Sequence, residues 1–375
     1  MKRKSGGKDF CGFALPGLFC FAAVVIVPFI YGIYLTLTDW NGVSTEKNFI
    51  GGANFLSVLK DSQFWSSLLL TFKYVVVVVV VVNILAFAIA YLLTRGFKGQ
   101  NFFRAGFFTP NLIGGLVLGY IWQFVFSRVF VGIGEATGWE LFGASWLSDP
   151  TLAFVALVIV SVWQLSGYMI LIYVAGFMGL NKDVMEAASI DGATGWTKLR
   201  HIILPLMMSS ITICLFLTLS RAFMVYDVNL SLTAGAPYGT TEMAAMHVYE
   251  KAFTSRQFGV GQAEALILFV IVAIISGIQV YLTKKREVDA YRIALEDSRI
   301  VTDRSQVFPH LPNHRTAAQT PVLDGESCRL DVFVDDHLIE VFVDDRRYVV
   351  SHVVYGLTDR LEGPVEELFA LREDR

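Results

Sequence analysis

The most distinctive spacing in this chain lies at residues 181–205, a moderately polar stretch between two long apolar segments, which we call the docking segment. Within it a glutamate is followed by two alanines, a glycine after three more residues, and an Ile-x-Leu-Pro ending. Small side chains beside a carboxylate allow a partner's groove to approach a helix closely. The residues of this pattern are Glu186, Ala187, Ala188, Asp191, Gly192, Ile202, Leu204 and Pro205. Their types permit such a close contact and predict no catalysis.

Local signals predict how the docking segment folds. Asp183, three residues before the glutamate, has the spacing of a capping box at a helix start. Gly192 and Gly195 permit a sharp exit, because glycine takes positive φ without steric cost. A second helix is expected from Trp196 to Ile203. An ordinary helical connector between two spans is the alternative that these signals leave open.

The elements that must position the docking segment are apolar runs. The chain has 375 residues, of which 54% are hydrophobic, and the apolar residues cluster into runs of the roughly 20 residues that cross a bilayer. Even the valine run at 75–82 is predicted to be helical, because unpaired backbone is too costly in lipid. The predicted fold is an all-α polytopic membrane protein with six transmembrane helices, near Phe10–Leu37, Trp65–Thr94, Ala105–Phe126, Leu152–Met178, Ile202–Val225 and Ala263–Leu282.

Charge gives the orientation and a domain boundary. Lys and Arg concentrate at the amino terminus, around residues 95–104, in the docking segment and at 284–286, which the positive-inside rule assigns to the cytoplasm together with both ends of the membrane unit. Residues 1–290 carry a net charge of +4 and residues 291–375 a net charge of −7. A shift of this size predicts a membrane domain over 1–290 and a different tail over 291–375.

The docking segment resembles the cytoplasmic loop of binding-protein-dependent ABC transporter permeases, in which a short coupling helix docks on an ATP-hydrolysing subunit. The stretches Leu37–Trp40, Phe49–Phe55 and Leu232–Thr241 resemble the outer loops of carbohydrate-uptake permeases, in particular the first permease subunit. The resemblance implies a related second permease, a dimer of ABC ATP-binding subunits and an extracytoplasmic sugar-binding protein as partners. It implies a place in the cell membrane and no nucleic acid partner.

Cofactors are expected on the partners alone. The chain lacks the Gly-x4-Gly-Lys-Ser/Thr phosphate loop, so ATP and Mg are expected on the ATPase subunit. The four cysteines have no paired spacing, and His310 and His314 are too irregularly placed to predict a metal site.

The predicted sugar path consists of polar and aromatic residues in the apolar runs or within a few residues of them, because polar groups in a bilayer often face the bundle interior and function there. These are Asn111, Trp122, Gln123, Trp163, Gln164, Tyr168, Arg221, Asp227 and Asn229. Helix–helix hydrogen bonds, or a pair between Arg221 and Asp227, are the alternative. Glu264, near a helix end, is expected to extend toward the membrane interface.

The tail has its own resemblance. Leu330–Asp344 alternates as two strands about a polar turn, and Arg299–Ser305 reads as an earlier strand. These stretches are similar to part of the carboxy-terminal β-sandwich of β-fructosidases, although Asp335-Asp336-His337 departs from the usual hairpin. Glycoside hydrolysis needs a pair of positioned carboxylates, which that family carries on another domain, so no catalytic residue is predicted here. We expect a fusion; a genuine accessory domain is the alternative.

The sequence therefore predicts the permease subunit of an ATP-driven ABC importer for a sugar, and the tail hints at sucrose or a fructooligosaccharide. Two other functions stay open at this point. They are a membrane-anchored fragment of a fructoside hydrolase and a stand-alone secondary transporter.

Overall fold

A computed structural model describes residues 15–96, 98–180, 185, 188, 193, 195–283 and six strands between residues 292 and 353, the strands by their backbone. The chain divides into two compact units, Met1–Lys284 and Lys285–Arg375, and each is described by itself. Within the docking segment, Glu186, Ala187, Asp191 and Gly192 lie outside the described residues.

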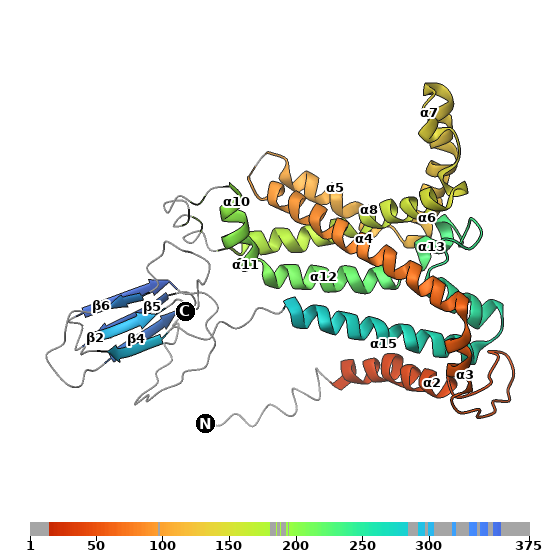
Figure 1. The fold of residues 1–375 in the computed structure, drawn as a ribbon, viewed down its shortest axis with the longest axis horizontal. Helices are drawn as coiled ribbons and strands as arrows, with labels where there is room; N and C mark the ends of the chain where they lie inside the picture. Colours follow the sequence, from red (N-terminus) through yellow and green to blue (C-terminus); the bar gives the residue numbers. More distant parts are fainter. Residues whose placement is uncertain are drawn as a thin grey trace. The chain divides into compact units, whose positions relative to one another are not determined.

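The first unit is helical, as predicted (Figure 1). Its described part contains five helices long and apolar enough to cross a membrane, or six if one bent pair counts as a single span. The five are Leu15–Leu35 (including η1, Ala22–Ile26, and α2, Val27–Leu35), α4 (Ser62–Leu93), Gly115–Thr137 (α6, Gly115–Phe124; η2, Val125–Val129; α7, Phe130–Thr137), α8 (Pro150–Met178) and α15 (Phe258–Thr283). The bent pair joins α10 (Gly195–Lys198), η5 (Leu199–Ile203) and α11 (Leu204–Leu206) to α12 (Met208–Phe223) at 72°.

Shorter helices connect these spans. They are α3 (Ala53–Lys60), α5 (Gln100–Leu112), η3 (Glu140–Phe142), η4 (Trp146–Ser148), α13 (Asp227–Leu232), α14 (Ala244–Tyr249) and η6 (Glu250–Thr254). The segment containing α13, α14 and η6 lies between the two spans α12 and α15.

The valine run lies inside α4 as helix, as predicted. Val75, Val78 and Val82 are buried, whereas Val80 between them is 50% exposed. Their spacing of three and four residues is that of one helix face. Eight identical side chains therefore divide into a packed face and an outer face only because of what lies beside the helix.

The core of the unit is the packing of α4 along α8, with α5 and α12 against this pair and α15 against α12 and α3 (Figure 1). Gly167 in α8 allows a close approach of α5, because a Cβ there would collide with the backbone carbonyl of Phe107 in α5. Close backbone contact through small residues is how membrane helices associate without a hydrophobic driving force.

Two predicted spans differ from the structure in their bounds. The expected third span, Ala105–Phe126, is interrupted, because Ile113 and Gly114 take extended backbone angles after Pro110 and separate α5 from α6. The expected fifth span, Ile202–Val225, begins later, because the chain bends at Met207 and α12 starts at Met208. Residues 202–206 thus belong to the segment that crosses the end of α12.

The described strands of the second unit form two three-stranded antiparallel sheets. One has the order β1 (Arg292–Glu296), β2 (Arg299–Asp303), β3 (Ala317–Gln319), and the other β4 (Leu330–Asp335), β5 (Leu338–Val343), β6 (Tyr348–Val353). The predicted hairpin is confirmed as β4 and β5, paired from Leu330 with Val343 to Asp335 with Leu338. The predicted earlier strand is confirmed as β2.

Candidate functional site

The described part of the docking segment is a bent, locally braced structure. The backbone N–H of Ala193 donates to the carbonyl of Ala188 at 2.9 Å, and Lys198 Nζ donates to the carbonyl of Met185 at 2.8 Å. Gly195 has a positive φ of 46°, which glycine adopts without strain. The predicted sharp turn before the second helix is therefore present at Gly195, and the second helix follows as α10, η5 and α11.

The described residues of the docking segment differ in exposure. Ala188 is buried, Ile202 and Leu204 are half-buried, and Pro205 is exposed. Trp196 is exposed as well. The segment thus joins the bundle through some apolar side chains while others face outward. This arrangement suits a surface that receives a partner, and the docking role itself stays a prediction.

Three residues of the predicted sugar path lie together. Arg221 at the end of α12 donates from Nη1 to Asn111 Oδ1 on α5 at 3.1 Å, and its guanidinium lies 5.1 Å from the centre of the Tyr168 ring on α8. Among the described residues no ion pair joins Arg221 to Asp227, so the pairing considered as the alternative is not formed. Three helices therefore contribute to one cationic and aromatic group.

A second part of the path is aromatic. The rings of Trp122 and Trp163 meet edge to face with centroids 5.4 Å apart, and Trp122 Nε1 is buried without a hydrogen-bond partner. Buried polar atoms normally have a partner, so this indole N–H is available to one. Gln123 and Gln164 instead donate to the backbone carbonyls of Leu232 and Ile113.

Asn229 and Asp227 do not join the aromatic and cationic groups of the predicted path. Asn229 is buried and fully used, since it donates to Thr233 and to the carbonyl of Thr241 and accepts from the N–H of Met243. Asp227 is exposed at the start of α13. The contacts of Asn229 hold the loop between α13 and α14, a structural role that differs from the helix–helix hydrogen bond considered as the alternative.

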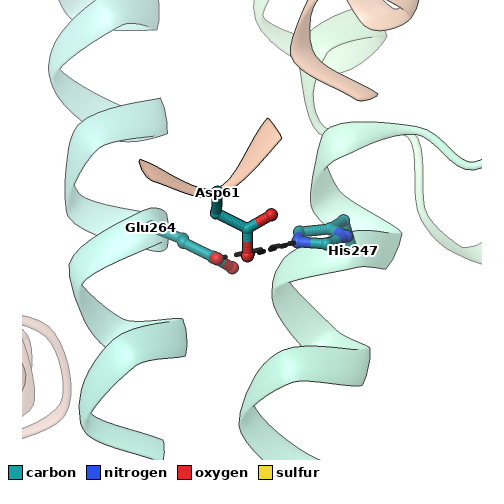
Figure 2. A group of neighbouring side chains, drawn as sticks. All are labelled: Asp61, His247 and Glu264. Atoms are coloured by element: carbon teal, nitrogen blue, oxygen red, sulfur yellow. Dashed lines mark ion pairs between the residues drawn. The ribbon is translucent and has the colours of Figure 1, made fainter. Parts of the chain in front are cut away.

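The structure also assembles a group that sequence reasoning missed, which we call the acid–imidazole cluster and which consists of Asp61, His247 and Glu264 (Figure 2). Asp61 precedes α4, His247 lies in α14, and Glu264 lies in α15. His247 Nε2 lies 3.6 Å from Glu264 Oε1 and 3.9 Å from Asp61 Oδ2. The expectation that Glu264 extends to the membrane interface is wrong, because its side chain is 0% exposed.

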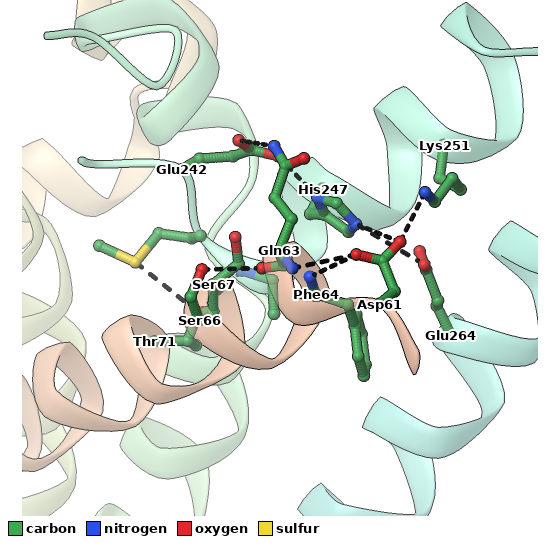
Figure 3. Close-up of polar contacts among 12 residues, drawn as sticks. Asp61, Gln63, Phe64, Ser66, Ser67, Thr71, Glu242, His247, Lys251 and Glu264 are labelled. Carbon is green, nitrogen blue, oxygen red and sulfur yellow. Dashed lines mark hydrogen bonds and ion pairs between the residues drawn. The ribbon is translucent and has the colours of Figure 1, made fainter. Parts of the chain in front are cut away.

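Neighbouring side chains hold the cluster in place (Figure 3). His247 Nδ1 lies 2.8 Å from Glu242 Oε1, and Gln63 Nε2 donates to the other oxygen of Glu242 at 3.1 Å. Asp61 Oδ1 accepts the backbone N–H groups of Gln63 and Phe64 and caps α4, while Lys251 Nζ lies 2.6 Å from Asp61 Oδ2. Asp61 and His247 are thus each fixed by a contact outside the cluster, whereas the polar contact of Glu264 is with His247, within it.

These contacts shift the proton affinities of the groups. Burial, the largest single influence, lowers the pKa of His247, but the hydrogen bond to Glu242 and the neighbouring Glu264 carboxylate outweigh burial and raise the pKa to about 9. The hydrogen bond from His247 is the main reason that the pKa of Glu242 is lowered. Burial acts to raise the pKa of Asp61, yet Lys251 and the Phe64 N–H together hold it below its ordinary value.

One signal in the sequence pointed to this cluster. Glu264 is an acid near the start of the apolar stretch Phe258–Thr283, and an ionisable residue within a membrane helix is by default a functional candidate. Its partners carried no such signal, because Asp61 and His247 lie in connecting segments far away in the sequence.

Two family matches divide the chain. Residues 83–288 match the family described as binding-protein-dependent transport system inner membrane component. Residues 275–364 match the family described as glycosyl hydrolases family 32 C terminal. Both resemblances predicted from the sequence are thereby confirmed, and the two matches overlap at the end of α15.

Curated relatives cover the membrane unit. The chain is 46% identical over 279 residues to the probable starch degradation products transport system permease protein AmyD of Thermoanaerobacterium thermosulfurigenes, spanning 74% of this chain and 94% of that protein. It is 31% identical over 261 residues to the multiple sugar-binding transport system permease protein MsmF of Streptococcus mutans, spanning 70% of this chain and 90% of that protein.

A solved structure shares the fold. The bacterial alginate ABC transporter in complex with alginate pentasaccharide-bound periplasmic protein contains a chain that superposes with a TM-score of 0.65 at 17% identity, covering 74% of this chain and 95% of that one.

Proposed function

Because the chain belongs to the family of binding-protein-dependent transport system inner membrane components, we propose that it forms part of the membrane path of an ATP-driven importer for a sugar. It is a multi-pass membrane subunit of a transporter and not an enzyme. The single observation that carries the proposal is the 46% identity with a permease protein over 94% of that protein's length.

Sugar as the cargo rests on two supports. The relatives are named for starch degradation products and for multiple sugars, and the helices bring aromatic rings and polar groups together in two places. Trp122 with Trp163 offers ring faces and an unpartnered indole N–H, while Arg221, Asn111 and Tyr168 offer donors beside a ring. Both kinds of group suit the hydroxyls and ring faces of a sugar.

The docking segment is proposed as the contact with an ATP-hydrolysing subunit dimer. The 72° bend between residues 195–206 and α12 supports this role, because it turns the segment across the end of a span instead of continuing it. Movement of a partner against Glu186–Gly192 would then be passed to α12 and, through its contacts, to α4 and α8. The ATP and Mg would be held by that partner.

The remaining partners and the orientation follow from charge and kinship. Both ends of the membrane unit are proposed to lie in the cytoplasm, with the protein in the cytoplasmic membrane, because Lys and Arg gather at residues 1–8, 95–104 and 284–286. A related second permease would complete the path as a heterodimer. An extracytoplasmic sugar-binding protein would deliver cargo to the opposite side, on which residues 36–61 and 224–257 are proposed to lie.

The two parts of the chain are proposed to be a permease domain, 1–290, and a hydrolase-like tail, 291–375, joined by a gene fusion. The division at Lys284 and the family match over 275–364 support this reading. Mass spectrometry of a peptide that crosses Arg286 and Arg292 tests it. Detection of that peptide supports one continuous chain, and two separate products would contradict it.

An uptake assay tests the function. Cells lacking this chain, complemented with it and its partner subunits, would be given labelled sugars from two classes. The first is starch degradation products, the class named for one relative, and the second is sucrose with fructooligosaccharides, suggested by the tail. We expect uptake of at least one class that depends on this chain and on ATP. Uptake of neither class, with the protein present in the membrane, would contradict the proposal.

A further inference from the structure

The acid–imidazole cluster draws three distant segments to one point. Asp61, His247 and Glu264 come from the start of α4, from α14 and from α15, and one ligand-type atom from each lies within 4.8 Å of the others (Figure 2). Nothing in the sugar path uses these residues. A common function at their meeting point is therefore separate from the transport route described above.

The atoms that face this point lack hydrogen-bond partners. Both carboxylate oxygens of Glu264 and Nε2 of His247 are buried without one, and the Glu264 side chain is fully inaccessible. A buried carboxylate without donors is costly, and such exceptions in a folded protein call for an explanation. A bound cation at the meeting point would give Nε2 of His247 and one oxygen of Glu264 the partner that they lack.

The surrounding contacts prepare the imidazole as a ligand. A carboxylate can only accept, so the 2.8 Å contact with Glu242 means that His247 Nδ1 carries a proton and donates it. The lone pair of neutral His247 is then on Nε2, which faces Asp61 and Glu264. A carboxylate behind a histidine is the usual outer support of a metal-binding imidazole. Gln63 in turn fixes Glu242.

The distances suit a small ion. Zn–N and Zn–O bonds near 2.0–2.2 Å in a tetrahedral site place neighbouring ligand atoms about 3.3 Å apart. His247 Nε2 lies 3.6 Å from Glu264 Oε1 and 3.9 Å from Asp61 Oδ2. All three ligand-type atoms lie within 4.8 Å of one another, so side-chain shifts that bring Asp61 and Glu264 closer together would close the site. Asp61 and Lys251, with side chains 17% and 21% exposed, border an entry side.

The charge of the site also suits a divalent ion. With a neutral imidazole, the carboxylates of Asp61, Glu242 and Glu264 and the ammonium of Lys251 sum to −2. A divalent cation brings this sum to zero, and its binding would release the proton that otherwise occupies Nε2. Lys251 is the competing cation, because it already contacts Asp61 Oδ2.

We propose that Asp61, His247 and Glu264 form a three-ligand site for a divalent transition-metal ion of the zinc class, with a fourth position open to water. One nitrogen and two carboxylate oxygens are a ligand set that zinc accepts. The ion would tie α14 to the start of α4 and to α15. It would act as a staple of the bundle.

Metal binding to the purified, tag-free full chain tests the proposal. After chelation and dialysis, Zn²⁺ would be titrated by calorimetry, and Co²⁺ would be added to record the visible absorption of tetrahedral coordination. We expect one Zn²⁺ per chain at this site, and at least a tenfold loss of affinity in Glu264→Gln, which keeps the shape of the side chain. Glu250→Gln, an acid in the next helical turn outside the cluster, is the matched control.

A second variant keeps the test decisive if Glu264→Gln misfolds. Lys251→Met removes the competing cation and should tighten Zn²⁺ binding several-fold while leaving all three ligands intact. Failure of the wild-type chain to bind Zn²⁺, or equal binding by wild type, Glu264→Gln and Lys251→Met, would overturn the site. The cluster would then be an ion-pair group alone. Neither readout depends on sugar transport.

Discussion

The docking segment and the acid–imidazole cluster differ in how their residues reach one another. The docking segment is continuous, and its described part is braced by contacts such as Lys198 with Met185, thirteen residues apart. The cluster joins Asp61 to Glu264 and needs α4, α14 and α15 to be packed before it exists. A site formed by consecutive residues can be predicted from a sequence motif, whereas a site assembled from distant residues can be identified only from the tertiary structure.

Breaking the docking segment should have the largest effect on function. Glu186→Lys reverses the charge offered to a partner, and Gly192→Pro removes the conformational freedom on which the predicted turn depends, so uptake of the labelled sugar should fall to the level of cells lacking the chain. Membrane insertion, followed by immunoblotting, should persist. Glu140→Lys, an exposed acid in η3, is the control. Normal uptake in either variant would rule out the docking role.

Breaking the acid–imidazole cluster should act on stability first. His247→Ala leaves the buried Glu264 and the partly buried Asp61 without the imidazole between them, and removing one member of a buried charged group costs about 3 kcal/mol. Denaturation in detergent would measure this loss. Glu250→Gln should change the free energy of unfolding by no more than about 0.5 kcal/mol. Equal stability of the two variants would show that the cluster contributes nothing.

The packing that assembles such sites can be tested at Gly167. Gly167→Ala would drive a Cβ into the carbonyl of Phe107 and should destabilise the unit by about 1–3 kcal/mol. At Gly132 in α7 a Cβ meets nothing within 4 Å, so Gly132→Ala should stabilise the helix by up to about 1 kcal/mol. The same Gly→Ala substitution should thus lower the unfolding temperature at position 167 and raise it at position 132, which thermal unfolding would measure. Equal shifts would mean that α5 and α8 are not closely packed.

The smallest effect is expected in the sugar path. Arg221→Lys keeps the charge but loses the planar group that lies over Tyr168 and donates to Asn111. The sugar concentration for half-maximal uptake should rise about two- to fivefold, which corresponds to a loss of less than about 1 kcal/mol of binding free energy. Arg128→Lys, on an exposed face of η2, should leave it unchanged. An unchanged value in Arg221→Lys would remove this residue from the path.

Part of the path was predictable and part was not. Composition marked Arg221, Asn111 and Tyr168 as polar or aromatic residues in apolar runs, and the structure brings these three together. Asn229, in contrast, holds a loop through three hydrogen bonds to neighbouring residues. Residue type indicates that a side chain needs partners in the membrane. It does not indicate whether those partners are protein or substrate.

The bounds of two spans show a similar limit. Hydropathy located apolar residues near 105–126 and 202–225 but not the break at Ile113–Gly114 or the bend at Met207. Pro110 indicated a possible helix break from the sequence, since proline removes a backbone donor from a helix. Where the chain turns, however, depends on the helices it packs against, and this information is spread over the whole unit.

The sequence by itself determined the membrane class, the helical spans, the strands of the tail and the kinship of both parts, because each is encoded in the order of neighbouring residues. Tertiary structure alone decided which of eight identical valines face inward, and that Asp61, His247 and Glu264 meet. Identical side chains carry no directional information, and a site assembled across 203 positions has no local pattern. The packing of the helices decided both the inward face of the valine run and the meeting of the three cluster residues, because burial depends on what surrounds a residue.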